Sequence, residues 1–415
     1  MVGSGAREHT IVWKLAQSSR ITDLFAAPGN AGMAKQAQVI EIKADDTESL
    51  AKFARENKID LTVVGPENPL AAGIVDKFQE AGLTIFGPTQ AATEIESSKV
   101  FAKDLMQKNG IPCAKSATFD NYEKAVDYIW QQKPPIVIKA DGLAAGKGVI
   151  IAANTKEAEK ALEGIMKTKQ FGEAGDRVVI EENLLGREMS FFVFTDGQKA
   201  LPTVPACDYK RIYDGNEGPN TGGMGSYSPP PFYNSILGDI IMKTIMEPTI
   251  LAMADEGRPY SGTLYGGLML ASNTPKVIEF NARLGDPETQ VVLPRMKTDL
   301  LEVILAVLDK KLDKISIEWR EEACVGVVMA SGGYPGKYET GLPISGLDEV
   351  DKDIMVFHAG TKAGPGGEIL TSGGRVLTVA ALGKNLAEAR EKVYNNIGRI
   401  RFSGCYYRKD IAENV

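Results

Sequence analysis

Short apolar runs alternate with amphipathic segments and glycine turns through the first 100 residues. The runs at 61–64 and 83–86 each lead into a Gly-Pro turn, and apolar residues at helical spacing, Ile11, Val12 and Leu15, follow the first glycine turn. Strands that alternate with helices in this way form a parallel sheet with helices on both faces. The pattern therefore predicts a doubly wound α/β domain over residues 1–100. Only two residues precede the first glycine, so either the first strand is a stub or the chain start is not the natural one.

Longer elements are expected in the rest of the chain. The spacing of apolar residues predicts helices over 94–106, 119–130, 157–166, 234–256, 299–308 and 386–398, and strands over 177–182, 189–195, 263–271, 276–280 and 323–331. Residues 207–229 carry no such pattern and are predicted to form a long structureless loop. Because one hydrophobic core rarely extends past about 250 residues, we expect two further domains. They cover residues 101–320 and a small β-rich α+β unit over 321–415.

Residues 135–150 read as a strand, a glycine-rich basic loop and a second strand. The loop holds Gly142, Gly146, Lys147 and Gly148, and Lys139 ends the first strand. Because glycine has no Cβ, such a loop can bring backbone N–H groups and an ammonium close to a polyphosphate. It is not a P-loop, which needs Ser or Thr after the lysine and then a helix. A phosphate-binding lid is the functional interpretation, and an ordinary mobile turn is the alternative.

Composition and charge narrow the class of protein. Hydrophobic residues make up 43% and charged residues 24% of the 415 residues, as in soluble globular proteins, and no apolar run is long enough to span a membrane. The net charge of −7 argues against a nucleic-acid partner. Four widely separated cysteines and only two histidines argue against a zinc site and a disulfide framework. We therefore expect a cytoplasmic, monomeric protein that acts on small molecules and binds neither nucleic acid nor membrane.

The first glycine turn contains Gly3 and Gly5, followed by Arg7 and Glu8. A dinucleotide-binding fingerprint needs a third glycine, and charged residues stand there instead, which disfavours a nicotinamide site. The start of a helix attracts anions, and a guanidinium adds to that attraction. A mononucleotide or sugar phosphate beside Arg7 therefore fits better, and a plain tight turn is the alternative.

Polar residues alternate at the end of the predicted strand 276–280. Glu279 and Asn281 fall on one face because side chains alternate along a strand, and Arg283 continues that face. Two converging oxygen ligands suit a hard cation such as magnesium. Unpaired polar groups on a buried strand face are costly, so a purely structural interpretation is weak.

The predicted loop over 207–229 combines charged residues with glycines. Asp208 and Lys210 precede Asn220, Thr221 and Gly223. A structureless loop of this length is uncommon in a compact chain and is usually functional or disordered. We predict that it binds a ligand.

Taken together, these motifs resemble one family. They are Gly-Ala-Arg-Glu-His at 5–9, Pro-Gly-Asn-Ala-Gly at 28–32, Lys-Ala-Asp-Gly-Leu-Ala-Ala-Gly-Lys-Gly-Val at 139–149, Gly-Pro-Asn-Thr-Gly-Gly-Met-Gly at 218–225 and Glu-Phe-Asn-Ala-Arg-Leu-Gly-Asp-Pro-Glu-Thr-Gln at 279–290. Over essentially its whole length the chain resembles the phosphoribosylamine–glycine ligase family of ATP-grasp proteins. The resemblance implies an ATP-grasp domain over 101–320 with a mobile lid at about 115–190. It also implies an ATP-dependent ligase of purine biosynthesis that joins glycine to 5-phosphoribosylamine through a glycyl phosphate, with Mg²⁺ or Mn²⁺.

The resemblance further implies roles for individual residues. Those expected to bind ATP are Lys99, Lys139, Gly142, Gly146, Lys147, Gly148, Glu181, Glu182 and Glu188. Those expected around glycine and 5-phosphoribosylamine are Gly5, Arg7, Glu8, Gly29, Asn30, Glu67, Asp208, Lys210, Asn220, Thr221, Gly223, Gly285 and Pro287. Glu279 and Asn281 would hold the metal. Arg283, Lys139 and Asp286 would be catalytic, with Arg283 stabilising the transferring phosphoryl group.

Other functions stay open on the sequence alone. A different ATP-grasp ligase, such as a carboxylating aminoimidazole ribonucleotide ligase, would share these motifs, and glycine-dependent phosphate release distinguishes the two. A nicotinamide dehydrogenase would bind NAD. A non-catalytic nucleotide sensor would show no turnover.

Overall fold

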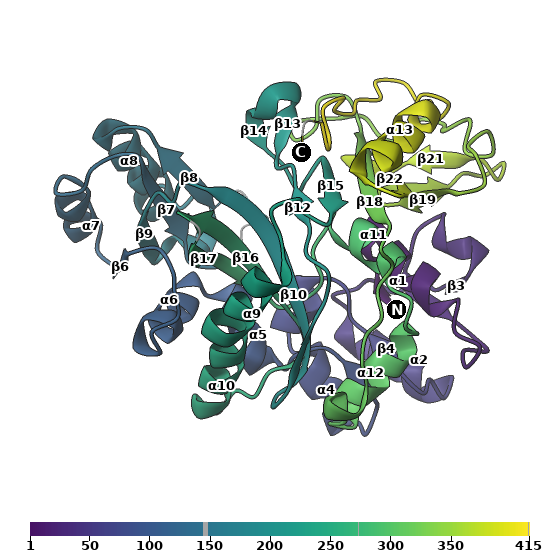
Figure 1. Cartoon of the computed structure of the whole chain (residues 1–415), viewed down its shortest axis with the longest axis horizontal. Coiled ribbons are helices and arrows are strands. Elements are labelled where there is room, and N and C mark those ends of the chain that lie inside the picture. Colours follow the sequence, from purple (N-terminus) through teal and green to yellow (C-terminus); the bar gives the residue numbers. More distant parts are fainter. Residues whose placement is uncertain (144–147, 273, 414) are drawn as a thin grey trace.

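The computed structural model describes residues 1–143, 148–272, 274–413 and 415. Figure 1 shows an amino-terminal lobe at lower right, a lobe of residues 116–182 at left and a carboxyl-terminal lobe at upper right. Between them run the long strands β10 (Arg187–Asp196), β16 (Ser261–Ala271) and β17 (Thr274–Asn281). Within the described ranges, no helix combines the length and apolar character needed to cross a membrane.

The amino-terminal lobe is a doubly wound α/β domain, as predicted. Its strands are β1 (Val2–Gly3), β2 (Phe25–Pro28), β3 (Gln38–Val39), β4 (Thr62–Val63) and β5 (Ile85–Phe86), and helices α1 (Ala6–Leu15), α2 (Thr47–Glu56), α3 (Glu67–Ala71) and α4 (Ile74–Glu80) connect them. The strands pair in parallel, and a bridge from Val2 to Val64 gives the order β3-β2-β1-β4-β5. The predicted stub is confirmed, since β1 has two residues. The order reverses between β1 and β4, where such folds bind ligands.

The single helix predicted over 94–106 is wrong, because the structure has two helices there. They are α5 (Gln90–Ser97) and α6 (Lys99–Lys108). The chain leaves the helical conformation at Ser98, whose hydroxyl accepts a hydrogen bond from the N–H of Phe101 and so caps α6. The Asp141 carboxylate accepts from the Ser98 hydroxyl and from the Val100 N–H. This break places Lys99 at the start of a helix, beside Gly142.

The lobe of residues 116–182 has its own sheet and its own core. Its elements are β6 (Ser116–Phe119), α7 (Tyr122–Ile129), β7 (Ile136–Ala140), β8 (Val149–Ala152), α8 (Thr155–Leu162) and β9 (Val178–Glu182), with the strand order β6-β9-β7-β8. Ile138, Leu162 and Ile180 belong to a separate apolar cluster. The helix predicted from Phe119 is wrong at its start, because Phe119 pairs with Val178 and Asn121 caps the helix.

The central sheet is buried on both faces. Its antiparallel order is β11 (Ala200–Pro202), β10, β16 and β17. Phe191 packs on the side of α9 (Ser235–Ile241) and α10 (Glu247–Asp255), whereas Phe192 packs on the side of α12 (Leu300–Leu308). In β17 only Pro275, Val277 and Phe280 are buried, and the pairing with β16 shifts between Gly267 and Leu268, so Glu279 and Asn281 lie together on a face that lines a cleft.

The segment 207–229 is not a structureless loop, and that prediction is wrong. It contains β12 (Cys207–Asp208), β13 (Arg211–Tyr213), β14 (Glu217–Asn220) and β15 (Gly225–Ser228). β12 and β15 join the carboxyl-terminal sheet of β18 (Ala323–Ala330), β22 (Arg375–Gly383) and β19 (Ile354–His358), which α13 (Leu386–Ile397) covers. The hydrogen-bonding partner of β15 lies about 100 residues later. Local sequence therefore could not reveal the pairing. The remaining predicted helices and strands are confirmed to within a few residues.

Candidate active site

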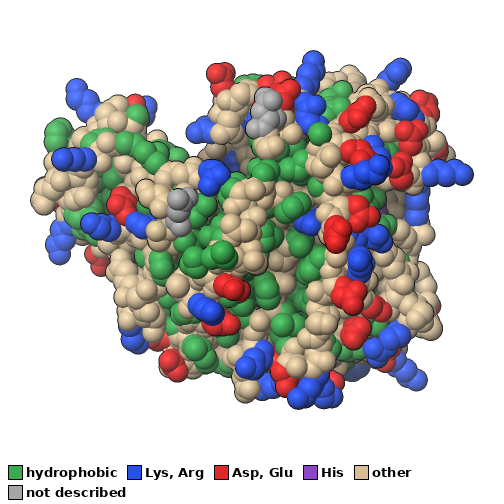
Figure 2. All heavy atoms as spheres, viewed as in Figure 1, with side chains coloured by type: hydrophobic (Ala, Val, Ile, Leu, Met, Phe, Trp, Pro, Cys, Tyr) green, Lys and Arg blue, Asp and Glu red, His purple; other side chains and the backbone are tan. Residues whose placement is uncertain are grey.

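One cleft of about 1590 Å³ lies where the lobes meet. Figure 2 shows its opening as the deep hollow between the left lobe and the rest of the molecule. Among the described residues, the predicted site residues that line it are Arg7, Glu67, Lys99, Lys139, Gly148, Glu181, Glu182, Glu188, Asp208, Lys210, Asn220, Thr221, Glu279, Asn281, Arg283 and Asp286. A pocket for one small ligand usually has about 300–1,000 Å³. The larger volume leaves room for more than one substrate.

Lys139 lies near the end of β7, opposite Val149 of β8. Its ammonium donates a hydrogen bond to the carbonyl of Ile278 at 2.8 Å and lies 3.0 Å from one oxygen of Glu181. Lys103 lies 3.1 Å from the other oxygen of Glu181, and all three side chains are buried. The Glu181 carboxylate therefore faces two lysines. Its predicted contact with the nucleoside stays a prediction.

The side chain of Lys99 contacts the segment that follows β7. Its ammonium donates to the carbonyl of Gly142 at 2.8 Å, and burial lowers its pKa against the attraction of Glu279. Gly142 has φ +150°, and a Cβ there would lie 2.7 Å from that of Ala174, so only glycine fits. The predicted phosphate ligands Gly146 and Lys147 lie outside the described residues.

The acids at the outer end of the cleft are paired with lysines. Glu182 accepts a hydrogen bond from the backbone N–H of Lys115 and lies 3.4 Å from Lys276. Glu188, at the start of β10, forms an ion pair with Lys210. This second pair links β10 to the segment that follows β12.

Glu279 and Asn281 lie on one face of β17, opposite Gly267 and Tyr265 of β16. Among the described residues, neither side chain has a hydrogen-bond partner. Burial disfavours the charged form of Glu279, but Lys210, Lys139, Lys99 and Arg283 outweigh it and lower its pKa. An ionised carboxylate and an amide oxygen that are both free toward the cleft fit a hard divalent cation.

Arg283 bridges two acids from the amino-terminal part of the chain. Its Nε lies 3.2 Å from Glu67, and its Nη2 lies 3.1 Å from Glu96. Burial disfavours ionised Glu67, yet Arg283 and Arg7 lower its pKa to about 2. Because two carboxylates hold it, the guanidinium is preorganised at the inner wall of the cleft.

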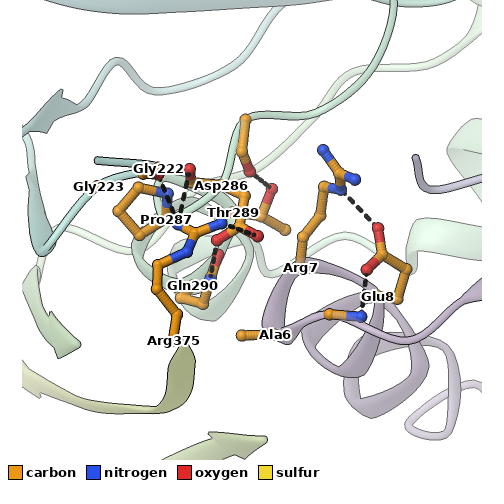
Figure 3. Close-up of polar contacts among 12 residues, drawn as sticks. Ala6, Arg7, Glu8, Gly222, Gly223, Asp286, Pro287, Thr289, Gln290 and Arg375 are labelled. Atoms are coloured by element: carbon orange, nitrogen blue, oxygen red, sulfur yellow. Dashed lines mark hydrogen bonds and ion pairs between the residues drawn. The ribbon is translucent and has the colours of Figure 1, made fainter. Parts of the chain in front are cut away.

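Arg7 reaches the cleft from α1, while its neighbours build the turn. The Nε of Arg7 donates to Glu8 at 2.6 Å, and its Nη1 donates to the carbonyl of Leu284 at 3.2 Å. Glu8 in turn accepts from the N–H of Gly5 at 2.6 Å (Figure 3). The side chain of Glu8 therefore caps α1 and does not line the cleft.

The side chain of Asn30 also forms hydrogen bonds within the protein. Its amide nitrogen donates to the carbonyls of Ser4 and His358, both at 2.8 Å, and its amide oxygen accepts from the N–H groups of Gly32 and Met33. Gly29 precedes it with φ +65°. The predicted substrate residues that do not line the cleft are Gly5, Glu8, Gly29, Asn30, Gly223, Gly285 and Pro287. A direct substrate contact stays a prediction for each.

Asp286 is held from two sides (Figure 3). One carboxylate oxygen lies 2.9 Å from Nη2 of Arg375, and the other accepts from the amide of Gln290 at 2.8 Å. Arg375 also donates to the carbonyl of Gly222 at 2.5 Å. It thereby ties Asp286 to the glycine-rich segment before β15. Gly223 has φ +108° and packs on Pro287, where a Cβ would lie 2.3 Å away.

Several residues that line the cleft were missed by the sequence analysis. They are Glu96, Lys103, Glu288 and Arg375. A charged residue at a core position of an amphipathic helix was an available signal for Glu96 and Lys103. Glu288 is buried and accepts from the Ser190 hydroxyl at 2.7 Å. Arg375 begins a strand of the carboxyl-terminal lobe, and only the fold brings it to the cleft.

Comparison with known proteins gives one consistent result. Models of the phosphoribosylglycinamide synthetase family match residues 1–96 (N domain), 97–289 (ATP-grasp (A) domain) and 324–414 (C domain). The phosphoribosylamine–glycine ligase of Caldanaerobacter subterraneus subsp. tengcongensis is 50% identical over 412 residues, which cover 99% of this chain and 98% of the relative. That of Allochromatium vinosum is 51% identical over 419 residues, covering 100% and 98%.

Solved structures agree with this result. The phosphoribosylamine–glycine ligase of Thermotoga maritima superposes with a TM-score of 0.87 at 32% identity, and the match covers 99% of this chain and 98% of that chain. A biotin carboxylase from Campylobacter jejuni, in complex with an ATP analogue, has a TM-score of 0.75 at 14% identity and covers 99% and 93%. At that identity the second likeness concerns the fold alone.

Proposed function

This chain belongs to the phosphoribosylglycinamide synthetase family, and we propose that the cleft between its lobes is where it joins glycine to 5-phosphoribosylamine. The chain is an ATP-dependent carbon–nitrogen ligase of purine biosynthesis. One observation carries the placement: Lys99, Lys139, Lys210 and Arg283 line a single cleft together with Glu279, and their positive charges lower the pKa of its carboxyl group. Phosphoryl transfer needs positioning and charge stabilisation more than a covalent nucleophile, and this cluster supplies both.

ATP would lie between the lid hairpin and the end of β17. Lys99 and Lys139 would contact its phosphates, and the backbone of Gly148 would approach them where a side chain is absent. Glu279 and Asn281 would hold Mg²⁺ or Mn²⁺, which would neutralise charge on the phosphate oxygens. Lys139 can contact a phosphate because Glu181 and the Ile278 carbonyl fix its ammonium at the cleft wall.

Two transfers then complete the reaction. A carboxylate oxygen of glycine attacks the γ-phosphorus, ADP leaves, and glycyl phosphate forms. The amine of phosphoribosylamine attacks the acyl carbon, inorganic phosphate leaves with the oxygen that glycine contributed, and the new amide nitrogen loses a proton. Arg283 would stabilise the charge that develops on the phosphoryl group and then on the acyl oxygen. Asp286, oriented by Arg375 and Gln290, would receive the amine and its proton.

The phosphate of phosphoribosylamine would lie at Arg7 and the start of α1, where a guanidinium and a helix terminus both favour an anion. We expect Arg7→Met to raise the KM for phosphoribosylamine and to leave the KM values for ATP and glycine unchanged. The loss should be about 1.5–3 kcal/mol, the range for a hydrogen bond to a charged group. Steady-state kinetics with each substrate varied in turn measures it.

The matched control is Arg20→Met, because Arg20 is an exposed arginine of the same lobe outside the cleft. It should leave all three KM values unchanged. A folded Arg7→Met enzyme with an unaltered KM for phosphoribosylamine would place the phosphate elsewhere.

The test of the function is ADP formation by the purified protein. We expect release of ADP and phosphate only when glycine and phosphoribosylamine are both present. Bicarbonate with aminoimidazole ribonucleotide should not replace them, and turnover with that pair instead would identify the carboxylating ligase. We place the enzyme in the cytoplasm, because its four cysteines are all free thiols and ATP is its substrate.

A further inference from the structure

The two histidines of the chain meet behind the substrate turn, outside the cleft. His9 lies on α1, two residues after Arg7, and His358 ends β19 of the carboxyl-terminal lobe. The backbone N–H of His358 donates to Nδ1 of His9 at 2.8 Å. Both side chains are almost fully buried, and neither lines the cleft. Figure 1 shows α1 directly beneath the carboxyl-terminal sheet, where it packs against β19.

Four hydrogen-bonded segments close a ring at this point. The carbonyl of His358 accepts from the Asn30 amide at 2.8 Å, and the same amide nitrogen donates to the carbonyl of Ser4 at 2.8 Å. Ser4 directly precedes Gly5, the amino-terminal cap of α1, and α1 carries His9 back to His358. The ring therefore joins the turn at 28–32, the turn at 3–5, helix α1 and strand β19.

The turn at 28–32 is tightly packed within this ring. A Cβ on Gly32 would lie 2.4 Å from ring atoms of both His9 and His358, so the backbone of the turn is packed between the two imidazoles. The amide oxygen of Asn30 accepts from the N–H groups of Gly32 and Met33. Nδ1 of His9 thus connects α1, the helix that carries Arg7, to the backbone of His358 in the carboxyl-terminal lobe. The carbonyl of His358 extends this connection to Asn30.

We propose that His9 is a positioning residue for phosphoribosylamine, acting through His358 and Asn30 to fix the start of α1 and Arg7 against the carboxyl-terminal lobe. The proposal rests on the proposed function, because it takes Arg7 as the ligand of the substrate phosphate. The described residues assigned to ATP and its metal lie on α6, on β7, β9, β10 and β17 or beside β7 and β8, and none of the ring's hydrogen bonds reaches them. Loosening the ring should therefore impair one substrate selectively.

The test compares two replacements of His9. His9→Leu removes the acceptor and leaves the buried N–H of His358 unpaired, whereas His9→Asn retains an oxygen acceptor near the position of Nδ1. We expect His9→Leu to raise the KM for phosphoribosylamine about tenfold or more, as a misplaced binding group does. The KM values for ATP and glycine should stay within about twofold, and His9→Asn should restore most of the loss.

Three further variants keep the outcome decisive. Asn30→Asp removes the amide donors from the other side of the ring and should reproduce the His9→Leu phenotype. Because Asn30 is itself a predicted substrate residue, His9→Met, which also lacks an acceptor at the position of Nδ1, replaces His9→Leu if that variant does not fold. His358→Asn keeps the backbone N–H and carbonyl that form the ring but removes an imidazole that packs on Gly32, so it should raise the KM for phosphoribosylamine less than His9→Leu does. A merely structural role predicts a lower Tm with all three KM values unaltered or shifted together, and that result would overturn the proposal.

Failure of this proposal is distinguishable from failure of the proposed function. If Arg7→Met raises the KM for phosphoribosylamine while His9→Leu and Asn30→Asp do not, the positioning role is refuted and the substrate placement stands. If the wild-type enzyme forms no ADP with glycine and phosphoribosylamine, the function itself is refuted.

Discussion

Replacing Arg283 by lysine should lower kcat by about 10³-fold, within the range for loss of a transition-state donor or of an arginine finger. The guanidinium is planar, binds Glu67 and Glu96 at 3.2 and 3.1 Å and donates from Nη1 to the Leu284 carbonyl at 3.3 Å, so the protein holds it at the cleft in one orientation. Lysine keeps the charge but cannot bridge two carboxylates and reach a phosphoryl group at once. The KM values should change little, because the lost interaction belongs to the transition state.

Lysine is the informative replacement because an uncharged residue would also destabilise the fold, and a loss of activity could then come from either effect. Removing one partner of a buried ion pair costs about 3–5 kcal/mol, and Glu96 is buried. Arg258→Lys is the matched control, since Arg258 also pairs with a glutamate, Glu94, but lies outside the cleft. It should keep nearly full activity. If Arg283→Lys, with ADP formation measured at saturating substrates, retains kcat within tenfold, Arg283 does not stabilise the transfer.

Replacing Glu279 by glutamine should lower kcat at least about 10²-fold and raise the magnesium concentration needed for half-maximal activity. The change is isosteric and removes only the charge of one proposed metal ligand. Four cations, from Lys99, Lys139, Lys210 and Arg283, keep that carboxylate ionised, and they would remain. Affinity for ATP should therefore not fall, because the phosphates would still meet a cationic cleft.

Glu94→Gln serves as the control for Glu279→Gln, because Glu94 is a surface partner of Arg258 and lies outside the cleft. Activity titrated with magnesium separates the two variants. Wild-type turnover of Glu279→Gln at low magnesium would remove Glu279 from the metal site.

Residues that lie close together in the sequence were predictable as a site. Glu279, Asn281 and Arg283 follow from strand alternation, and the end of β17 and the two residues after it place all three on the cleft. Lys139 follows from the hairpin pattern, and β7 and β8 pair as expected. In each case the local period decides which way a side chain points, and one buried face fixes the register.

The side-chain contacts that could not be predicted from the sequence depend on pairing between distant segments of the chain. Arg375 meets Asp286 only because β22 joins β18, and His358 meets His9 only because α1 docks on β19. Glu8 and Asn30 were predicted as substrate ligands, which stays a prediction, and the sequence did not reveal that Glu8 accepts from Gly5 and Arg7 or that Asn30 donates to Ser4 and His358. A polar residue beside a glycine turn serves a turn or a substrate equally well, and only the contacts distinguish the two roles.

The measurement that tests the central claim most directly uses glycine labelled with ¹⁸O in both carboxylate oxygens. Attack of that carboxylate on ATP and release of phosphate from glycyl phosphate transfer one glycine oxygen to phosphate in each turnover. Mass spectrometry of the products should therefore find one ¹⁸O in inorganic phosphate, one in the new amide and none in ADP. Unlabelled phosphate, or label in AMP, would contradict the account.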